Sequence, residues 1–279
     1  MIRTRFSLVT RLLFYIFLTA FGLLWLLPVV FMLFTALKSP ADLFGSASLF
    51  SIPKHIEWSN FTSAWQEGNM GLYMKNSLFI TLVKVPAGIF IAALGAFALT
   101  RLNYKWSNPT FALILVGMMI PVQVTLVPLS MFLKWTNLID THLGIILVYL
   151  GFGIPFAVLV LRGFFRTIPK ELDDAARIDG CSDFGLFWRI LLPIAMPAVA
   201  TLVILDFLST WNEFLLSQTF LTSNGLRTIP SGLMIFKGEF GTNYGLMNAG
   251  VLISVIPILV IYLVFQKYFV QGLAGSVKG

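Results

Sequence analysis

Residues 12–37 read LLFYIFLTAFGLLWLLPVVFMLFTAL, a run of 26 residues without a charged side chain. A helix rises 1.5 Å per residue and the hydrocarbon core of a bilayer is roughly 30 Å thick, so about 20 apolar residues span it. Arg3, Arg5 and Arg11 precede the run. It is too long for the core of a signal peptide, and no small-x-small cleavage site follows it directly. The stretch therefore predicts an uncleaved membrane helix.

The composition of the whole chain agrees with this opening stretch. Of 279 residues, 58% are hydrophobic and 11% are charged, whereas soluble domains carry roughly 25% charged residues. A soluble fold of this size could not cover so much apolar surface, which excludes a soluble enzyme and a disordered protein. The single cysteine, Cys181, excludes an intrachain disulfide scaffold. The net charge of +7 fits basic flanks of membrane helices better than nucleic-acid binding.

Six apolar segments predict an all-α polytopic membrane protein that forms a single transmembrane domain over residues 1–279. The expected spans are residues 12–37, 76–100, 110–133, 144–161, 194–217 and 246–266. We expect an interruption of the fourth span at GFGIP, residues 151–155, because Gly and Pro often break helices around transporter cavities. The longest connections are residues 38–75 and 162–193, and a tail follows from residue 267 to 279.

The basic residues predict which side each connection faces. With the N-terminus inside, the inner segments carry twelve Lys and Arg residues and the outer segments six. An excess of basic residues marks cytoplasmic loops. Both termini, the loop 162–193 and the tail 267–279 are therefore expected in the cytoplasm, and the loop 38–75 outside.

The inner loop is the most charged part of the chain, with RTIPKELDDAARIDGCSDFGLFWRILLP at residues 166–193. Pro169 suits the first position of a helix, and the acids after it suit a helix N-terminus. Leu172, Ala175, Ala176 and Asp179 share one face at helical spacing. We expect Gly180 to end this helix and Ser182 to cap a second one, with Phe184, Phe187 and Trp188 as its apolar contacts. The pattern favours a docking surface over a connector folded against its own spans.

The inner loop resembles the "EAA" loop of permease subunits of ATP-binding-cassette (ABC) importers. That pattern is Glu-Ala-Ala, three residues, Gly, nine residues and Ile-x-Leu-Pro. The positions that match it are Asp174, Ala175, Ala176, Gly180, Ile190, Leu192 and Pro193, with Asp179 in the Ile-Asp-Gly of the carbohydrate branch. Asp174 stands where the family usually has Glu, which keeps the charge and shortens the side chain by one methylene.

The resemblance extends over nearly the whole chain. WNEF at residues 211–214 is similar to the carbohydrate-importer branch, and QGLAGSVKG at 271–279 to the tail of the second permease subunit of maltose-type importers. It implies the type I importer permease fold, a coupling loop that contacts a cytoplasmic ATPase, and a tail that reaches the ATPase interface through Gly272, Gly275 and Lys278. It also implies a bacterial or archaeal cytoplasmic (inner) membrane location.

The chain lacks the Gly-x-x-x-x-Gly-Lys-Ser/Thr loop that cradles nucleotide phosphates. We therefore expect no enzyme in this chain and no cofactor of its own, with ATP and magnesium bound by separate ATPase subunits. The implied partners are a second permease subunit, two cytoplasmic ATPase subunits, an extracytoplasmic solute-binding protein and membrane lipid, with no nucleic acid.

Polar residues inside the fifth span are the candidate path for cargo. Asp206, Ser209, Thr210, Glu213 and Ser217 follow one face at helical spacing. A charge in a bilayer costs about 2.5–3.5 kcal/mol on insertion scales and normally faces protein or water. The stripe lines the path, or it forms hydrogen bonds within the subunit with Lys84 as counter-ion. Gln123 and Asn212 are further path candidates, and Gln123 can equally bind a neighbouring helix.

The sequence thus predicts a permease subunit of an ATP-driven importer for a sugar or oligosaccharide. The same architecture importing glycerol phosphate or another polyol-like solute is the alternative. An ion-coupled secondary transporter with Lys84, Asp206 and Glu213 as its relay is a rival, but it leaves the inner loop unexplained. A membrane-embedded enzyme or a metal site finds no support, because no nucleophile–base pair and no metal cluster is evident.

Overall fold

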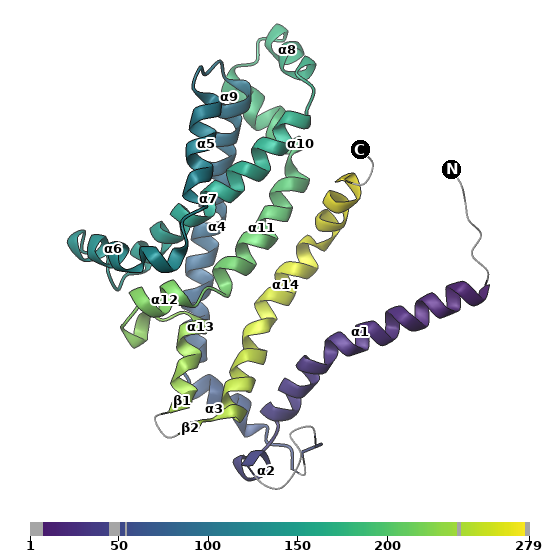
Figure 1. Ribbon diagram of the computed structural model, residues 1–279, viewed down its shortest axis with the longest axis vertical. Helices are drawn as coiled ribbons and strands as arrows, with labels where there is room; N and C mark the ends of the chain where they lie inside the picture. The colour runs from purple at the N-terminus through teal and green to yellow at the C-terminus, as the bar shows by residue number, and fades with distance from the viewer. Residues whose placement is uncertain (1–7, 45–50, 54, 239–240, 277–279) are drawn as a thin grey trace. The chain divides into compact units, whose positions relative to one another are not determined.

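The computed structural model describes residues 8–44, 51–53, 55–238 and 241–276, and it is mainly helical (Figure 1). The chain divides into two compact units, which we describe separately. One comprises Met1–Asn69 and Leu233–Ser254, and the other Met70–Gly232 and Val255–Gly279.

Four single helices are long and apolar enough to cross a membrane. They are α1 (Leu8–Ala36), α4 (Met70–Arg101), α7 (His142–Thr167) and α14 (Tyr244–Ser276). Two bent helix pairs also qualify, so the described residues hold up to six spans if each bent pair counts as one. The first, second, fourth and sixth expected spans each fall on one of the four single helices.

The third expected span, residues 110–133, is not one helix. It is divided into α5 (Ser107–Gly117) and α6 (Val122–Trp135), which meet at an angle of 94°. Pro121 lies at the break in an extended conformation, because proline has no amide hydrogen to donate and disfavours a helical residue before it. Gln123 accordingly lies in the first turn of α6 rather than in the middle of a continuous span.

The fourth expected span was predicted to be interrupted but is continuous. α7 runs unbroken from His142 to Thr167 through GFGIP, with Pro155 inside it, so the expected interruption is wrong. Neighbouring helices can support a proline within a membrane helix, and α7 packs along α4 for much of its length. The helix also takes in Arg162 and Arg166, so the inner loop begins later than residue 162.

The fifth expected span, residues 194–217, also differs. α11 (Met196–Trp211) ends before the polar stripe does, and α12 (Leu215–Phe220) starts after a break. On the other side, Asp183–Ile194 meets α11 at 73°. Asp206 and Glu213 therefore do not share one continuous helix.

Small side chains shape the core of the second unit. α4 contributes Ala92, Ala93 and Ala96, each at most 1% exposed, where it packs on α7 and α11. Small residues let membrane helices approach closely, which increases their van der Waals contact. The long helices of this unit are thereby fixed against one another.

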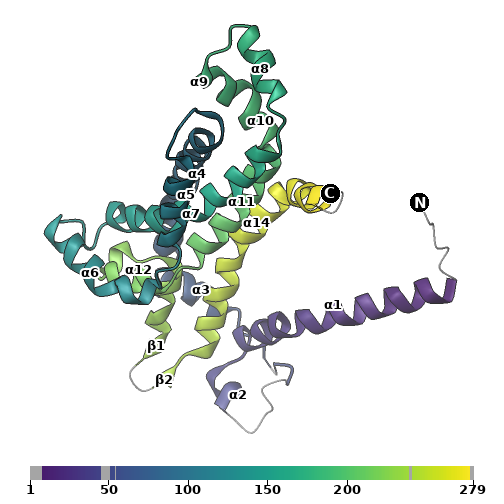
Figure 2. The same ribbon diagram turned by 45° about the horizontal axis from the view of Figure 1, so that its top comes forward.

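Short elements occupy both ends of the second unit, with α8 and α9 at one end and α12 at the other in both views (Figures 1 and 2), and α13 beside α12 in Figure 1. They are α8 (Glu171–Ile178), α9 (Asp183–Leu186), the π-helical turn η1 (Phe187–Leu191), α10 (Leu192–Ile194), η2 (Asn224–Leu226) and α13 (Ile229–Gly232).

The first unit joins α1 to a compact group of short elements. These are α2 (Pro40–Phe44), α3 (Ser59–Gln66), η3 (Leu233–Phe236), β1 (Lys237–Gly238), β2 (Gly241–Thr242) and the start of α14. β1 and β2 pair antiparallel. The Asn60 side chain donates to the carbonyls of Ala36 and Lys38 at 2.9 and 3.0 Å, which fastens α3 to the end of α1.

The expected C-terminal tail is helical throughout its described residues, 267–276. α14 continues to Ser276 and includes Gly272 and Gly275. Lys278, like Arg3 and Arg5 at the other end of the chain, lies outside the described residues.

Candidate functional site

The helix expected in the inner loop is confirmed as α8. It starts at Glu171, two residues after Pro169, and carries Asp173 and Asp174 in its first turn. Gly180 follows its end with a φ of +78°. That left-handed conformation strains any residue with a Cβ, so glycine is the natural stop.

The two sides of α8 are used differently. Asp173 and Ala176 are buried, at 7% and 6% exposure, whereas Ile178 is 86% exposed. Leu172, Asp174, Ala175 and Asp179 are also exposed. The expectation that Ala176 belongs to the same docking face as Leu172, Ala175 and Asp179 is therefore wrong, because Ala176 packs into the core of the second unit. Ala175 remains on the open face, together with apolar Leu172 and Ile178.

Arg101, the last residue of α4, ties α8 to the membrane helices. Its Nη2 donates to the carbonyls of Phe165 at 3.0 Å and Ile168 at 2.7 Å, at the end of α7. Its Nε lies 3.1 Å from Oδ2 of Asp173, and both side chains are at most 10% exposed. Sequence reasoning missed this contact, because no local spacing relates residue 101 to residue 173.

The environment of Asp173 disfavours its charged form. Burial raises the pKa of this carboxyl above its ordinary value, and the nearby charges of Arg101 and Arg177 compensate only in part. Its Oδ1 is buried without a hydrogen-bond partner. Arg101 is thus the main group that stabilises the carboxylate.

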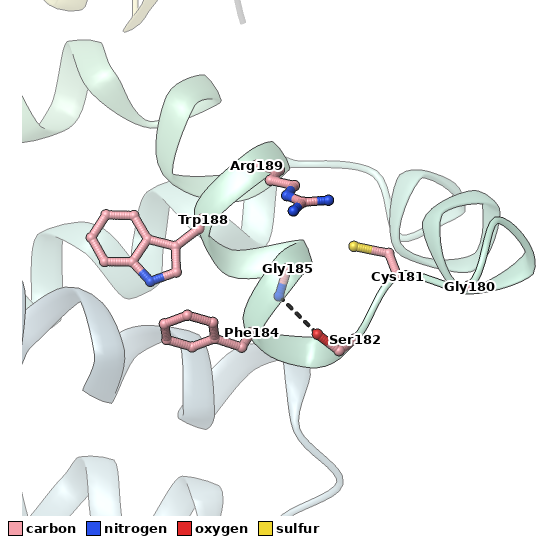
Figure 3. A pocket seen from close by; sticks show the side chains of 7 residues that line it. All are labelled: Gly180, Cys181, Ser182, Phe184, Gly185, Trp188 and Arg189. Atoms are coloured by element: carbon pink, nitrogen blue, oxygen red, sulfur yellow. Dashed lines mark hydrogen bonds between the residues drawn. The ribbon is translucent and has the colours of Figure 1, made fainter.

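The second helix of the loop is also confirmed. Ser182 caps α9 by accepting a hydrogen bond from the amide of Gly185 at 3.2 Å (Figure 3). A Cβ at Gly185 would lie 2.6 Å from Sγ of Cys181. Glycine at this position therefore lets the cysteine fold back against the helix.

An open hollow of about 650 Å³ lies beside α9 (Figure 3). It is lined by Gly180, Cys181, Ser182, Phe184, Gly185, Trp188 and Arg189. The rings of Phe184 and Trp188 meet edge to face with centroids 6.0 Å apart, and they are 66% and 42% exposed. Phe187 alone of the three expected apolar contacts is fully buried.

The end of the family pattern forms an irregular turn. Ile190 and Leu192 are half-buried and Pro193 is exposed. The amide of Leu192 donates to the carbonyl of Phe187, five residues back, as in a π-helix. Pro193 has no amide to bond with Arg189, so it cannot maintain the ordinary helical ladder there.

Inside the membrane region, Asp206 of α11 forms an ion pair with Lys84 of α4. The Lys84 side chain is 4% exposed and that of Asp206 18%. Gly153 of α7 leaves room for Lys84 in this position, since a Cβ there would lie 2.6 Å from its Nζ. The expectation that Lys84 serves as counter-ion within the subunit is confirmed.

Glu213 has a different set of partners. Its carboxylate accepts hydrogen bonds from the Tyr149 hydroxyl at 2.6 Å and from the amides of Leu216 and Ser217 at 2.7 and 3.0 Å. It thus caps the start of α12 and binds it to α7. Sequence reasoning missed Tyr149, because a tyrosine in an apolar helix gives no signal of its partner.

The other candidate path residues are dispersed. Thr210 is buried and Gln123 exposed. Asn212 is exposed, and its side chain donates to the carbonyl of Leu208 at 3.0 Å. Among the described residues, no group of His, Cys, Asp and Glu side chains is arranged to hold a metal ion.

Comparison with known proteins identifies the family. The model of the family described as "Binding-protein-dependent transport system inner membrane component" matches residues 84–274, which is more than half of the chain. The chain therefore belongs to this family of multi-pass inner-membrane proteins.

Individual relatives agree with that assignment. The probable ABC transporter permease protein YurM of Bacillus subtilis is 40% identical, over 90% of this chain and 83% of its own length. The arabinooligosaccharides transport system permease protein AraQ of the same organism is 34% identical, over 95% and 94%. The resemblance to carbohydrate-type ABC importer permeases that the inner loop indicated is confirmed.

A solved structure shows the shared fold. It is a bacterial ABC transporter involved in the import of the acidic polysaccharide alginate, with a TM-score of 0.79, 22% identity and coverage of 95% of this chain and 99% of that chain. The chain accordingly has the fold of an ABC importer permease.

Proposed function

We propose that residues 1–279 act as one permease domain with six spans in an ATP-driven importer. A second, different permease subunit completes the pore, two ATPase subunits bind ATP and magnesium, and an extracytoplasmic binding protein delivers the solute. Both termini and the loop around α8 face the cytoplasm in this proposal. The excess of basic residues in the inner segments supports that orientation.

The observation that carries the proposal is the open face of the inner loop. Ile178 at 86% and Phe184 at 66% exposure stand on short helices whose other sides are anchored in the core. Such apolar side chains are costly to leave in water and are typical of a surface that a partner covers. The matched positions of the coupling pattern, from Asp174 to Pro193, lie in the same segment. We assign ATPase docking to this face, and contact with the ATPase interface to Gly272, Gly275 and Lys278.

For the cargo we propose a sugar or an oligosaccharide. Relatives named as carriers of arabinooligosaccharides and of sulfoquinovosyl glycerol support this class. Asp206, Thr210, Asn212, Glu213 and Gln123 are the candidate path residues. Since Asp206 and Glu213 already have partners in this subunit, we assign them packing as well, so that direct contact with cargo falls to the exposed Asn212 and Gln123.

The test is uptake by vesicles that contain the full complex with its binding protein. Radiolabelled maltotriose, arabinotriose and glycerol 3-phosphate serve as probes, with ATP or its non-hydrolysable analogue enclosed. We expect ATP-dependent accumulation of one of the two sugars. Equal accumulation without ATP would overturn the importer assignment, and uptake of glycerol 3-phosphate alone would replace the sugar by the phosphorylated polyol.

A further inference from the structure

One guanidinium joins three helices at the inner end of the second unit. Arg101 belongs to α4, the two carbonyls that it binds belong to the end of α7, and Asp173 belongs to α8. Its side chain is 3% exposed. The junction therefore connects the short helix of the inner loop directly with two membrane helices.

Only arginine fits this junction. A guanidinium is planar and directs several N–H groups outward in fixed directions, whereas an ammonium is a compact point charge. Nη2 serves the carbonyls of Phe165 and Ile168 while Nε faces Asp173. A lysine could satisfy one of these sites but not the others, so the connection depends on the shape of the side chain as well as on its charge.

The junction is costly, which argues against a role in stability alone. Removing two charges from water carries a penalty of several kcal/mol per ion, and a buried pair is weak support for stability. Here Oδ1 of Asp173 and Nε of Arg101 also lack good hydrogen bonds. Apolar side chains would pack α8 at lower cost. What the ion pair adds is a fixed orientation and position of α8 relative to α4 and α7.

The same loop contains a matched contrast. Arg177 of α8 lies 2.9 Å from Asp183 of α9, with the two side chains 51% and 54% exposed. Exposed pairs of this kind contribute about 0–1 kcal/mol. This second pair joins α8 to α9, its neighbour in the loop.

We propose that Arg101 and Asp173 are positioning residues that make α8 move together with α4 and α7. A displacement of the docked loop then reaches the membrane helices, and without the junction it is absorbed within the loop. This inference rests on the proposed function. It assigns transmission to the buried side of α8 and leaves ATPase binding to the exposed side.

The experiment measures two quantities on the reconstituted complex. The first is the amount of ATPase subunit that copurifies, and the second is the number of ATP molecules hydrolysed per probe molecule imported. The probe is whichever of maltotriose, arabinotriose and glycerol 3-phosphate the unmodified complex imports. The variants are Arg101→Lys and Asp173→Asn, with Asp173→Glu as the conservative replacement and Arg177→Gln and Asp183→Asn as controls.

We expect Arg101→Lys and Asp173→Asn to bind the ATPase within about twofold of the unmodified chain while hydrolysing about tenfold more ATP per molecule imported. Asp173→Glu keeps the carboxylate and should stay within about threefold. Both controls should keep the ratio of ATP hydrolysed per molecule imported within about twofold of the unmodified chain. Because Arg177 and Asp183 are exposed beside the docking face, any larger effect of these controls should appear in ATPase binding.

Three results would overturn the inference. The first is an unchanged ratio in both junction variants, and the second is loss of ATPase binding, which would place the junction in the docking surface. The third is loss of folded protein in the nearly isosteric Asp173→Asn, which would show that the pair serves stability. Failure of the proposed function is distinguishable, because it appears as ATP-independent import by the unmodified complex.

Discussion

The membrane helices and the inner loop differ in which side chains have partners within this subunit. Lys84 pairs with Asp206, and Glu213 is occupied by Tyr149 and the start of α12. In the loop, Ile178 and Phe184 are exposed apolar side chains. The membrane helices pair these acidic side chains within one subunit and expose apolar side chains where lipid is expected, whereas the loop exposes apolar side chains in a segment that is expected outside the membrane. This contrast supports our proposal that partner binding belongs to the loop and that the membrane charges hold this subunit together.

Removing one member of the membrane ion pair should have the largest effect. Asp206→Leu leaves Lys84 buried without a partner, which costs about 3–5 kcal/mol for a buried pair. The unfolding temperature of the subunit in detergent should fall accordingly. In the double variant Lys84→Met/Asp206→Leu, most of the stability and uptake should return, with ATPase binding unaffected. A double variant that is stable but inactive would show instead that Asp206 lines the path.

The exposed tip of α8 offers the complementary change. Ile178→Asp places a charge where we expect an apolar contact, and should weaken ATPase binding more than tenfold, as substitutions at central contacts do. The free energy of unfolding of the isolated subunit should change by less than about 0.5 kcal/mol. Asp174→Ala and Gly180→Ala should also weaken binding while membrane insertion continues. If ATPase copurification and uptake are normal in these variants, the docking assignment is wrong.

The cap of α12 should give an intermediate effect. Glu213→Ala removes an acceptor shared by two amides and the Tyr149 hydroxyl, and lost caps typically cost about 0.5–2 kcal/mol. Glu213→Gln keeps one acceptor oxygen and should lose less. The unfolding temperatures of the two variants measure this difference. Equal losses in both would show that the carboxylate charge, rather than the cap, is what matters.

The smallest effect is the pH dependence of stability that Asp140 contributes, at the end of the second unit away from α8. Burial opposes the charge of Asp140, but hydrogen bonds from Ser223 and Thr222 together outweigh it and lower the pKa below 3.8. A lowered folded-state pKa gives stability that is present above the unfolded pKa and lost as pH falls through the folded pKa. Between pH 6 and pH 3, about the range where this carboxyl starts to titrate, the unfolding temperature should fall more in the unmodified chain than in Asp140→Asn. Parallel curves would contradict this.

Local signals in the sequence predicted much of the loop. Gly180 as the helix stop and Ser182 as a cap follow from rules that involve only neighbouring residues. The Lys84–Asp206 pair was one of the two alternatives that the sequence left open, because a charge in an apolar region normally faces either protein or water.

Features set by distant packing were not predictable. The continuous path of α7 through Pro155 depends on the support of α4, and the break after Trp211 on a cap that Tyr149 helps to hold. Likewise, Ala176 lies on the buried face of α8 with Asp173, one turn earlier, which pairs with Arg101. Spacing along one helix indicates which residues share a face, but not which face meets the core.

Site-specific photo-crosslinking at Ile178 tests the central assignment most directly. A photoreactive residue at this position, in membranes that contain the complete complex, should give an adduct with the mass of the ATPase subunit. The same residue at Trp135, which is 80% exposed at the end of α6 and is expected outside, should give none. No ATPase adduct at position 178, or equal adducts at both positions, would contradict the assignment of the inner loop as the docking surface.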